Sequence, residues 1–405
     1  MVPPNNVMAS LFSIDTQAAS AIVDLPRGDA AQRHAEQRRG PLPSSMRLHV
    51  AMIAPPWYPV PPNGYGGIEI MVSLLVDELR SRGHQVTLFA AAGSEDRAVV
   101  RAPAEWNADL GQHAERLREL TYGARVLASL RLRGDVDVVH DHVGHGTLLG
   151  VAQLSDVPVV HTVHGALSEP ERTFYAALTG TVNLVAISAS QRAGADELPW
   201  IGTVHNAVPL HPVRESDGEG TSPYLVCLAR ICADKGQHTA IEVARRTGLR
   251  LVLAGKVENT EASREYYETQ VLPWIDGDRV VYLPNVVGDD KTRLLGGAAA
   301  LLAPITWDEP FGLSVVEAMA GGTPAISFPR GAAGEVIEDG LTGFLVRDAD
   351  EMVAAVARVD EIDPALCAAV TRRRFSPEAM ADGYLRMYER AESPAATDAA
   401  QVTAG

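Results

Sequence analysis

Cysteine and long apolar stretches are both scarce in this chain of 405 residues. Its three cysteines, Cys227, Cys232 and Cys367, form no CxxC pair, and such a set fits a reducing cytoplasm better than a disulfide framework. The longest nearly apolar run, residues 294–304, holds 11 residues, short of the ~18 residues that indicate a membrane span. A signal peptide would show an apolar segment behind a basic start, and the sequence shows no such segment. The sequence therefore predicts a cytoplasmic protein.

Lysine is also rare, and only Lys235, Lys256 and Lys291 occur, so most of the 35 basic residues are arginine. In a chain with this bias, a remaining lysine is favoured at a position that needs a compact ammonium group. Asp and Glu number 51, which gives a net charge of −16. That balance argues against a protein that coats nucleic acid through a cationic face, while leaving room for a local basic pocket.

Short β-branched apolar runs alternate with helix-length segments along most of the chain. Residues 48–53 and 86–90 have the character of buried strands, and residues 68–82 between them carry apolar side chains at helical spacing. The alternation restarts at residue 224, after a polar stretch rich in Pro, Gly, Ser and Glu. This pattern predicts an α/β protein of two doubly wound, Rossmann-like halves that face each other across a cleft. Ligands bind beyond the carboxyl ends of such strands, so we expect the site in that cleft.

The same pattern divides the chain into six segments. Residues 1–45 are polar and show no sustained period, so we expect a disordered extension there. We expect Rossmann-like domains over 46–208 and 223–376, a linker over 209–222, a helix over 377–392 that packs back on the N-terminal domain, and a disordered tail over 393–405.

The strongest local signal is WDEPFGLSVVEAMAGGTP at residues 307–324, which follows a buried strand and enters a helix. A tight turn here would leave the N–H groups of Gly312, Leu313 and Ser314 free at a helix N-terminus, where anions bind. Glu309 precedes these amides and Glu317 follows them. Because carboxylates suit sugar hydroxyls better than phosphate, the arrangement predicts a ligand with a diphosphate between two sugars. The alternative interpretation is that Glu309 is a solvated loop charge and Glu317 an exposed helix residue.

The Glu-x7-Glu spacing of this segment resembles the hallmark of family 4, the large retaining family of GT-B glycosyltransferases. Other segments are similar to motifs of that family, in the same order along the chain. They are the glycine loop at 64–69, the HTxHG element at 161–165, the R…KG segment at 230–236, the strand end at 253–255, and the NGxTGFLV stretch at 340–346 with Asp339 in place of the Asn. The resemblance covers about residues 46 to 392. It implies that the N-terminal half holds the acceptor and the C-terminal half the donor nucleotide.

The resemblance also implies roles for the charged residues that match these motifs. It places Glu309 on the transferred sugar and Glu317 on the ribose of the donor. Arg230, at a strand's carboxyl end, and Lys235, at the opening of the next helix, would bracket the diphosphate and stabilise the charge that builds on it. The alternative interpretation makes Arg230 and Lys235 a surface pair.

The glycine loop around Gly66 and Gly67 opens the first helix of the N-terminal half. It lacks the G-x-G-x-x-G spacing of a dinucleotide site, and no acidic residue ends the next strand. The resemblance implies a loop that lets the backbone approach the donor phosphate and the acceptor; the alternative is an ordinary turn. Loops 54–65 and 91–112 would shape the acceptor side, with aromatic residues for stacking at Trp57, Tyr58, Tyr65 and Trp106.

Five histidines cluster in the N-terminal half, at His140, His142, His145, His161 and His164. A zinc site needs a closed set of three or four ligands, and no cysteine is near, so we expect no metal. His140 and His161 fit core or supporting positions. His164 follows a strand end that should face the cleft, and the resemblance places it against the transferred sugar.

Arginines stud residues 114–133, and several members of the family bind membranes through a basic amphipathic surface of the N-terminal domain. The interspersed acidic residues favour a solvated helix face instead. We therefore expect at most a peripheral association with the inner face of the membrane.

Together these observations predict a metal-independent, retaining hexosyltransferase of class EC 2.4 that uses a UDP- or GDP-sugar. The resemblance implies front-face attack, in which the departing phosphate oxygen takes the proton of the acceptor hydroxyl. It implies no cofactor beyond the nucleotide-sugar donor, and a small molecule, a glycan or a lipid-linked compound as acceptor. Alternatives are a sugar-nucleotide epimerase or phosphorylase of the same fold, or a non-catalytic sugar-nucleotide-binding protein. A nicotinamide dehydrogenase is disfavoured because its fingerprint is missing.

Overall fold

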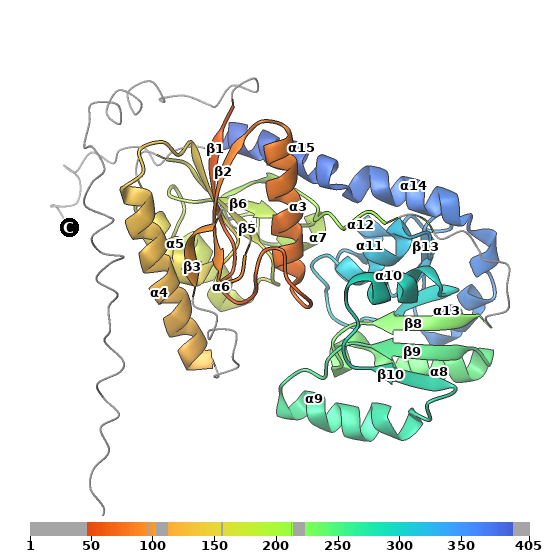
Figure 1. Ribbon diagram of the computed structural model, residues 1–405. Helices are drawn as coiled ribbons and strands as arrows, with labels where there is room; N and C mark the ends of the chain where they lie inside the picture. The colour runs from red at the N-terminus through yellow and green to blue at the C-terminus, as the bar shows by residue number, and fades with distance from the viewer. Residues whose placement is uncertain are drawn as a thin grey trace, which may run out of the picture. The chain divides into compact units, whose positions relative to one another are not determined.

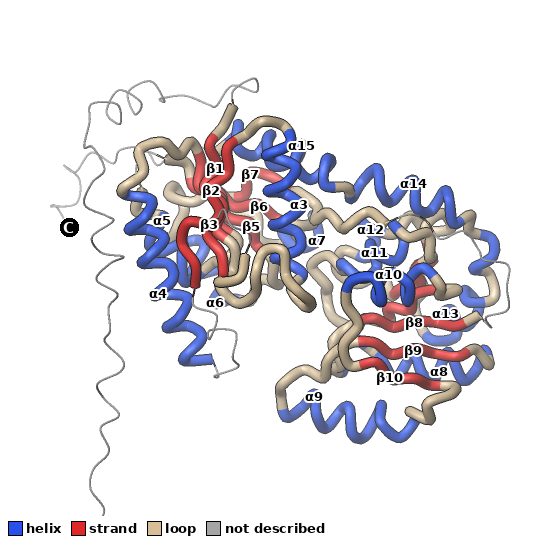
Figure 2. Tube along the Cα trace, in the orientation of Figure 1, coloured by secondary structure: helices blue, strands red, loops and turns tan. Residues whose placement is uncertain are grey.

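The computed structural model describes residues 47–94, 98–102, 112–154, 157–211, 213 and 223–391. Their contacts place all of these residues in one compact unit, which holds two parallel sheets (Figure 1). The predicted extension 1–45, the tail 393–405 and most of the predicted linker 209–222 lie outside the described residues. Figure 2 shows the alternation of strands and helices that the sequence pattern predicts for a doubly wound fold.

The N-terminal sheet has seven strands in the order β3-β2-β1-β4-β5-β6-β7. In sheet order they are β3 (Ala98–Ala102), β2 (Gln85–Ala91), β1 (His49–Ile53), β4 (Val138–Asp141), β5 (Val159–Val163), β6 (Asn183–Ala186) and β7 (Trp200–Thr203). Every residue of the four strands β1, β4, β5 and β6 is buried, as expected for a parallel sheet covered on both faces.

Helices cover both faces of this sheet. They are α3 (Gly67–Ser81), α4 (Gln112–Arg131), α5 (His145–Val151), α6 (Glu169–Ala176), α7 (Ala189–Arg192) and, from the end of the chain, α15 (Pro377–Arg390). One core cluster joins α3 and α15 to the sheet, and a second joins α4, α5 and α6 to it. Helix α15 contacts α3 and β7, so the last helix of the described chain packs on the first sheet.

The C-terminal sheet has six strands in the order β10-β9-β8-β11-β12-β13. In sheet order they are β10 (Val280–Leu283), β9 (Arg250–Ala254), β8 (Tyr224–Leu228), β11 (Ala300–Ala303), β12 (Ala325–Ser327) and β13 (Gly343–Leu345). Its helices are α8 (Gln237–Thr247), α9 (Glu261–Tyr266), α10 (Gly288–Gly296), α11 (Leu313–Ala320), α12 (Ala333–Val336), α13 (Ala349–Val356) and α14 (Pro364–Phe375).

The fold differs from the sequence-based expectation in a few elements. Strands β3, β7 and β13 were not predicted. All three are edge strands, and β7 and β13 are also short and contain a glycine. Lys235 does not open the helix that follows β8. It ends a 3-10 turn (Ala233–Lys235), and Gly236 with φ 70° separates that turn from α8. No helix among the described residues combines the length and apolarity that crossing a membrane requires.

Candidate functional site

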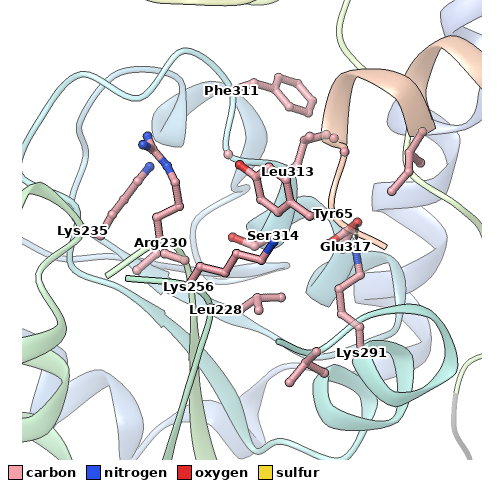
Figure 3. A pocket seen from close by; sticks show the side chains of 18 of the residues that line it. Tyr65, Leu228, Arg230, Lys235, Lys256, Lys291, Phe311, Leu313, Ser314 and Glu317 are labelled. Atoms are coloured by element: carbon pink, nitrogen blue, oxygen red, sulfur yellow. Dashed lines mark hydrogen bonds and ion pairs between the residues drawn. The ribbon is translucent and has the colours of Figure 1, made fainter. Parts of the chain in front are cut away.

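A pocket of about 400 Å³ lies at the carboxyl ends of strands of both sheets (Figure 3). Its wall includes the glycine loop before α3, the residue after β5, the segments after β8 and β9, and the start of α11. All ten sequence-predicted site residues line it. They are Gly66, Gly67, His164, Arg230, Lys235, Glu309, Gly312, Leu313, Ser314 and Glu317. The structure therefore brings together residues from two domains that the sequence motifs connect only by order.

The start of α11 forms one end of the pocket. Gly312 takes φ 89°, a left-handed conformation that favours glycine, and caps the helix. Leu313 and Ser314 are the first residues of the helix, so their N–H groups have no acceptor within it and carry the positive end of its dipole. Gly67 approaches this turn so closely that a Cβ atom there would lie 2.9 Å from Leu313 Cδ1. The start of α3 thus lies against the side chain of Leu313 at the start of α11.

Each carboxylate expected to bind a sugar is paired with a lysine. Lys235 forms an ion pair with Glu309 and also lies over the ring of Trp307, with Nζ 5.0 Å from the ring centre. Lys291 Nζ donates to Glu317 Oε1 at 2.6 Å, and Figure 3 shows the lysine pointing to that carboxylate. These pairs hold the carboxylates in place before a ligand arrives.

All three lysines of the sequence line the pocket, although only Lys235 was assigned to the site from its motif. Lys256 Nζ lies 5.3 Å from the ring centre of Tyr65, which belongs to the glycine loop. The rarity of lysine was the signal that could have identified Lys256 and Lys291. With Arg230, four cations and two carboxylates line the pocket, so its charge is positive within a protein of net charge −16.

Arg230 is held by the strand that lies next to it. The bridge between Ile231 and Val257 extends the pairing of β8 with β9 by a few residues, and the N–H of Glu258 donates to the carbonyl of Ile231 at 3.2 Å. The Glu258 carboxylate forms an ion pair with Arg230 and accepts a hydrogen bond from Ser263 Oγ at 3.1 Å. Motif reasoning did not identify Glu258, because its contact with Arg230 depends on the pairing of two loops beyond their strands.

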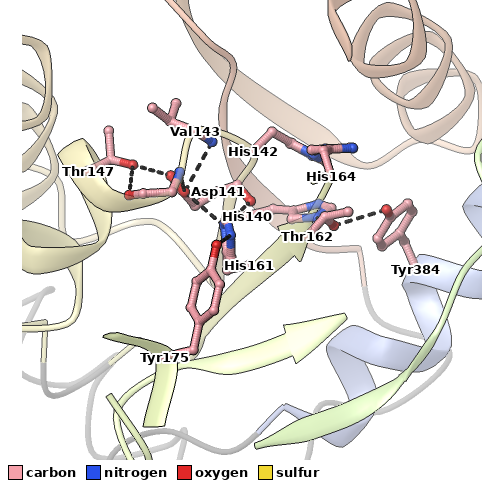
Figure 4. Close-up of polar contacts among 11 residues, drawn as sticks. His140, Asp141, His142, Val143, Thr147, His161, Thr162, His164, Tyr175 and Tyr384 are labelled. Carbon is pink, nitrogen blue, oxygen red and sulfur yellow. Dashed lines mark hydrogen bonds and ion pairs between the residues drawn. The ribbon is translucent and has the colours of Figure 1, made fainter. Parts of the chain in front are cut away.

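His164 lies directly after β5, and its Nε2 is 3.0 Å from Nδ1 of the buried His142 (Figure 4). Burial, and secondarily the positive charge that His161 can carry, lower the pKa of His164 to about 3. The imidazole is therefore neutral at physiological pH. It is a hydrogen-bonding group rather than a cation.

Two of the neighbouring histidines, His140 and His161, have protein partners for both ring nitrogens. His140 contacts the hydroxyls of Tyr388 at 2.8 Å and Thr162 at 2.9 Å. His161 Nδ1 lies 3.1 Å from Asp141 Oδ1. No group of three or more potential metal ligands occurs within the described part of the chain. His140 and His161 occupy buried positions in the fold.

Glu69 is a buried carboxyl that sequence reasoning left without a role. It lies in the first turn of α3, is only 4% exposed, and would lie 2.9 Å from a Cβ atom at Gly66. Burial raises the pKa of Glu69 to about 7. The glycine loop therefore rests on a group that takes up or loses a proton near neutral pH.

The aromatic residues expected on the acceptor side divide between the pocket and its surroundings. Tyr65 lines the pocket and is half exposed, and its ring lies 6.0 Å from that of Tyr58 in an edge-on arrangement. Trp57 is partly buried in the same loop, whereas Trp106 lies outside the described residues.

Comparisons with known proteins identify the family of this chain. The family described as "Glycosyltransferase Family 4" matches residues 65–212, and "Glycosyl transferases group 1" matches residues 213–376. The chain is 29% identical to a glycogen synthase of Mycobacterium tuberculosis over 364 residues, covering 75% of this chain and 84% of the relative. It is 24% identical to a phosphatidyl-myo-inositol mannosyltransferase of Mycobacterium leprae, covering 84% and 96%.

Solved structures show the same fold. The chain is similar to AviGT4, a glycosyltransferase involved in avilamycin A biosynthesis, with a TM-score of 0.60, 24% identity, and coverage of 85% of this chain and 97% of that one. It is also similar to HepE of Anabaena in complex with UDP-glucose, with a TM-score of 0.64, 18% identity, and coverage of 85% and 100%.

Proposed function

Since the chain belongs to the group 1 glycosyltransferases with the GT-B fold, we propose that it transfers a hexosyl group from a UDP- or GDP-sugar to an acceptor hydroxyl with retention of configuration. The observation that carries this proposal is the pocket itself. Four cations and the free amides at the start of α11 face a volume that two carboxylates also line. A diphosphate flanked by two sugars matches this distribution of charge and hydrogen-bond acceptors.

The donor diphosphate would bind between Arg230, Lys235 and the amides of Leu313 and Ser314. Lys235 is 9% exposed, so its charge acts in a weakly screened environment. When the glycosidic bond breaks, negative charge builds on the departing phosphate, and these preorganised groups stabilise it. They supply the charge that a divalent cation supplies in other transferases, and we propose that this enzyme needs no metal ion or cofactor.

The two carboxylates divide the remaining contacts. Glu309 precedes the amides of α11 and would accept hydrogen bonds from the transferred sugar, while Glu317 lies deeper in the helix and would bind the ribose. His164, on the opposite wall, would contact the sugar from the N-terminal side. In the front-face mechanism the acceptor hydroxyl gives its proton to the departing phosphate oxygen, so the protein mainly orients two substrates.

The acceptor is a small molecule, a glycan or a lipid-linked compound. The names of the two curated relatives point to a glucan acceptor for one and a lipid acceptor for the other, so both classes belong in a screen. Tyr65 offers a ring at the pocket edge on which a sugar or a ring-containing acceptor can stack.

A donor screen tests the proposal. UDP-, GDP- and ADP-sugars are incubated with the full chain without acceptor, and slow hydrolysis is followed by release of the nucleoside diphosphate. We expect hydrolysis of one donor class, retained anomeric configuration in the transfer product by NMR, and a higher melting temperature with the matching nucleotide. EDTA should change none of these results. Activity that EDTA abolishes and Mn²⁺ or Mg²⁺ restores would overturn the proposed role of Arg230 and Lys235.

A further inference from the structure

The buried histidines behind the pocket form a connected group that the proposed chemistry does not use. His142 and His140 pack against each other with ring centres 4.0 Å apart and planes tilted by 44°, and both side chains are almost completely buried. His140 bonds to Thr162 and to Tyr388 of α15, and Thr162 in turn bonds to Tyr384 of that helix at 2.9 Å. Figure 4 shows this group extending from His164 to Tyr384. The C-terminal helix therefore supports the ring against which His142 packs.

Among the described residues, one ring nitrogen of His142 has a hydrogen-bond partner and the other has none. Its Nδ1 lies 3.0 Å from His164 Nε2, whereas no described residue hydrogen-bonds to its buried Nε2. A proton on Nε2 would be a buried donor with no acceptor, which is the costlier of the two tautomers because orphaned buried N–H groups are rare. The proton of neutral His142 therefore belongs on Nδ1, where it donates to His164.

This hydrogen bond determines the state of His164. If His164 Nε2 accepts a hydrogen bond from the Nδ1–H of His142, then Nε2 carries no proton of its own, and the proton of the neutral ring lies on Nδ1. A doubly protonated His164 would place its Nε2–H against the Nδ1–H of His142, so the pair also opposes the charged form. The low pKa of His164 agrees with this geometry.

We infer that His142 is a positioning residue that fixes His164 as a neutral donor with its proton on Nδ1, directed at a hydroxyl oxygen of the transferred sugar. His164 then gives a hydrogen bond and takes no part in proton transfer. The choice of tautomer selects a ligand group that can accept, such as a hydroxyl oxygen, and disfavours an ammonium group. The sugar contact rests on the proposed function, whereas the tautomer of His164 rests on the geometry alone.

NMR of the histidine ring nitrogens tests the tautomer without any substrate. The full chain is labelled with ¹⁵N-histidine, and among its 12 histidines the His164 signals are identified by their loss in His164→Gln. We expect a protonated Nδ1 and an unprotonated Nε2 for His164 in the wild type, and a change of this pattern in His142→Leu. A protonated Nε2 in the wild type, or a pattern unchanged in His142→Leu, would overturn the inference.

Kinetics test the positioning role. Asparagine at position 142 can place an amide N–H close to where His142 Nδ1 lies, whereas leucine cannot donate. His142→Leu should lower kcat/KM for the donor about tenfold, the cost of a misdirected hydrogen bond, and His142→Asn should recover most of it. His145→Leu is the control, because His145 is exposed at the start of α5 and no hydrogen bond connects it to His164 among the described residues. Equal losses in the Leu and Asn variants, with melting temperatures unchanged, would contradict the positioning role. If no donor is turned over, the proposed function fails while the NMR result still decides the tautomer.

Discussion

The two walls of the pocket hold their polar groups in different ways. On the C-terminal wall, charged side chains form ion pairs, and water reaches the pair of Arg230 and Glu258: the Arg230 side chain is 43% exposed and that of Glu258 30%. Behind the N-terminal wall, neutral rings form hydrogen bonds in a buried cluster, where His140 and His142 are at most 2% exposed. Charge that is screened couples weakly to its neighbours, whereas buried hydrogen bonds couple strongly. In the proposed complex, this difference suits the C-terminal wall to binding the diphosphate and the N-terminal wall to orienting the sugar.

We expect the largest loss of activity at Lys235, where the charged C-terminal wall of the pocket is most buried. In the proposed complex, Lys235→Ala removes a cation from beside the departing diphosphate and leaves the Glu309 carboxylate without its lysine partner. Loss of one preorganised group at a developing anion costs about 10²–10³ in kcat, and Arg230→Ala should lie at the lower end of that range because it is more exposed. Steady-state kinetics with the donor varied measure this.

Arg246→Ala is the matched control for charge removal. Arg246 pairs with Glu242 and Asp350 on the surface of the same domain and does not line the pocket. Near-wild-type turnover of Lys235→Ala at saturating donor would show that Lys235 belongs to the surface alternative rather than to the site.

The next prediction concerns Glu69 and tests whether burial controls the protonation of a carboxyl group on the N-terminal side of the pocket. The pKa of this carboxyl is about 7 in the folded protein, raised by burial from 4.5, so the folded state binds the proton more tightly than the unfolded state. Its contribution to stability is complete below pH 4.5 and is lost as the pH rises through 7. Glu69→Gln should therefore match the wild type near pH 4.5 and exceed it at pH 8 by about 3 kcal/mol of unfolding free energy. Urea unfolding at the two pH values measures this.

Glu268→Gln serves as the control, since Glu268 is exposed on the surface. A Glu69→Gln variant whose stability follows the wild type at both pH values would show that the folded protein solvates the Glu69 carboxylate in spite of its burial.

Substitutions of the two glutamates on the C-terminal wall should change different kinetic constants, kcat for Glu309 and KM for Glu317. Glu309 lies beside the transferred sugar in the proposed complex, where positive charge develops, so Glu309→Gln should lower kcat by about 10–100-fold through loss of a charge-assisted hydrogen bond. Glu317 would bind the ribose equally well throughout the reaction, so Glu317→Gln should mainly raise the donor KM. Lys291→Met should resemble Glu317→Gln, because Lys291 holds that carboxylate. The reverse pattern would mean that the donor lies the other way round in the pocket.

The sequence predicted the framework of the site better than the contacts within it. Parallel strands place their carboxyl ends at one edge, so motifs that follow strands meet in the fold, as His164, Arg230 and Glu309 do. Which charges pair there depends on loops that pair beyond their strands, and the sequence pattern did not show that Glu258 lies against Arg230.

The sequence motifs also failed to predict the positions of two lysines and the raised pKa of Glu69. Composition identified lysine as rare, but no motif placed Lys256 or Lys291 at the pocket. Glu69 stands in the quoted glycine-loop motif, yet its raised pKa comes from tertiary burial, which a motif does not record. The roles of the site residues stay predictions that the variants above decide.

The smallest effect is expected at Glu258, where the two walls contrast most directly. Glu258 holds the pocket residue Arg230 in place, as His142 holds His164. The Arg230–Glu258 pair is open to water and uses one of the several N–H groups of the guanidinium, which leaves the others for a diphosphate. Removing the carboxylate loosens Arg230 and also removes a negative charge from beside the anion, and in water these two effects are each about 1 kcal/mol or less and opposite in sign.

Glu258→Gln should therefore change the donor KM less than about threefold and leave kcat unchanged, whereas His142→Leu lowers kcat/KM about tenfold. Donor kinetics of the two variants, measured side by side, check the comparison. A tenfold loss in Glu258→Gln would show that the charged wall is as tightly coupled as the buried histidines, and that exposure to water does not distinguish the two walls.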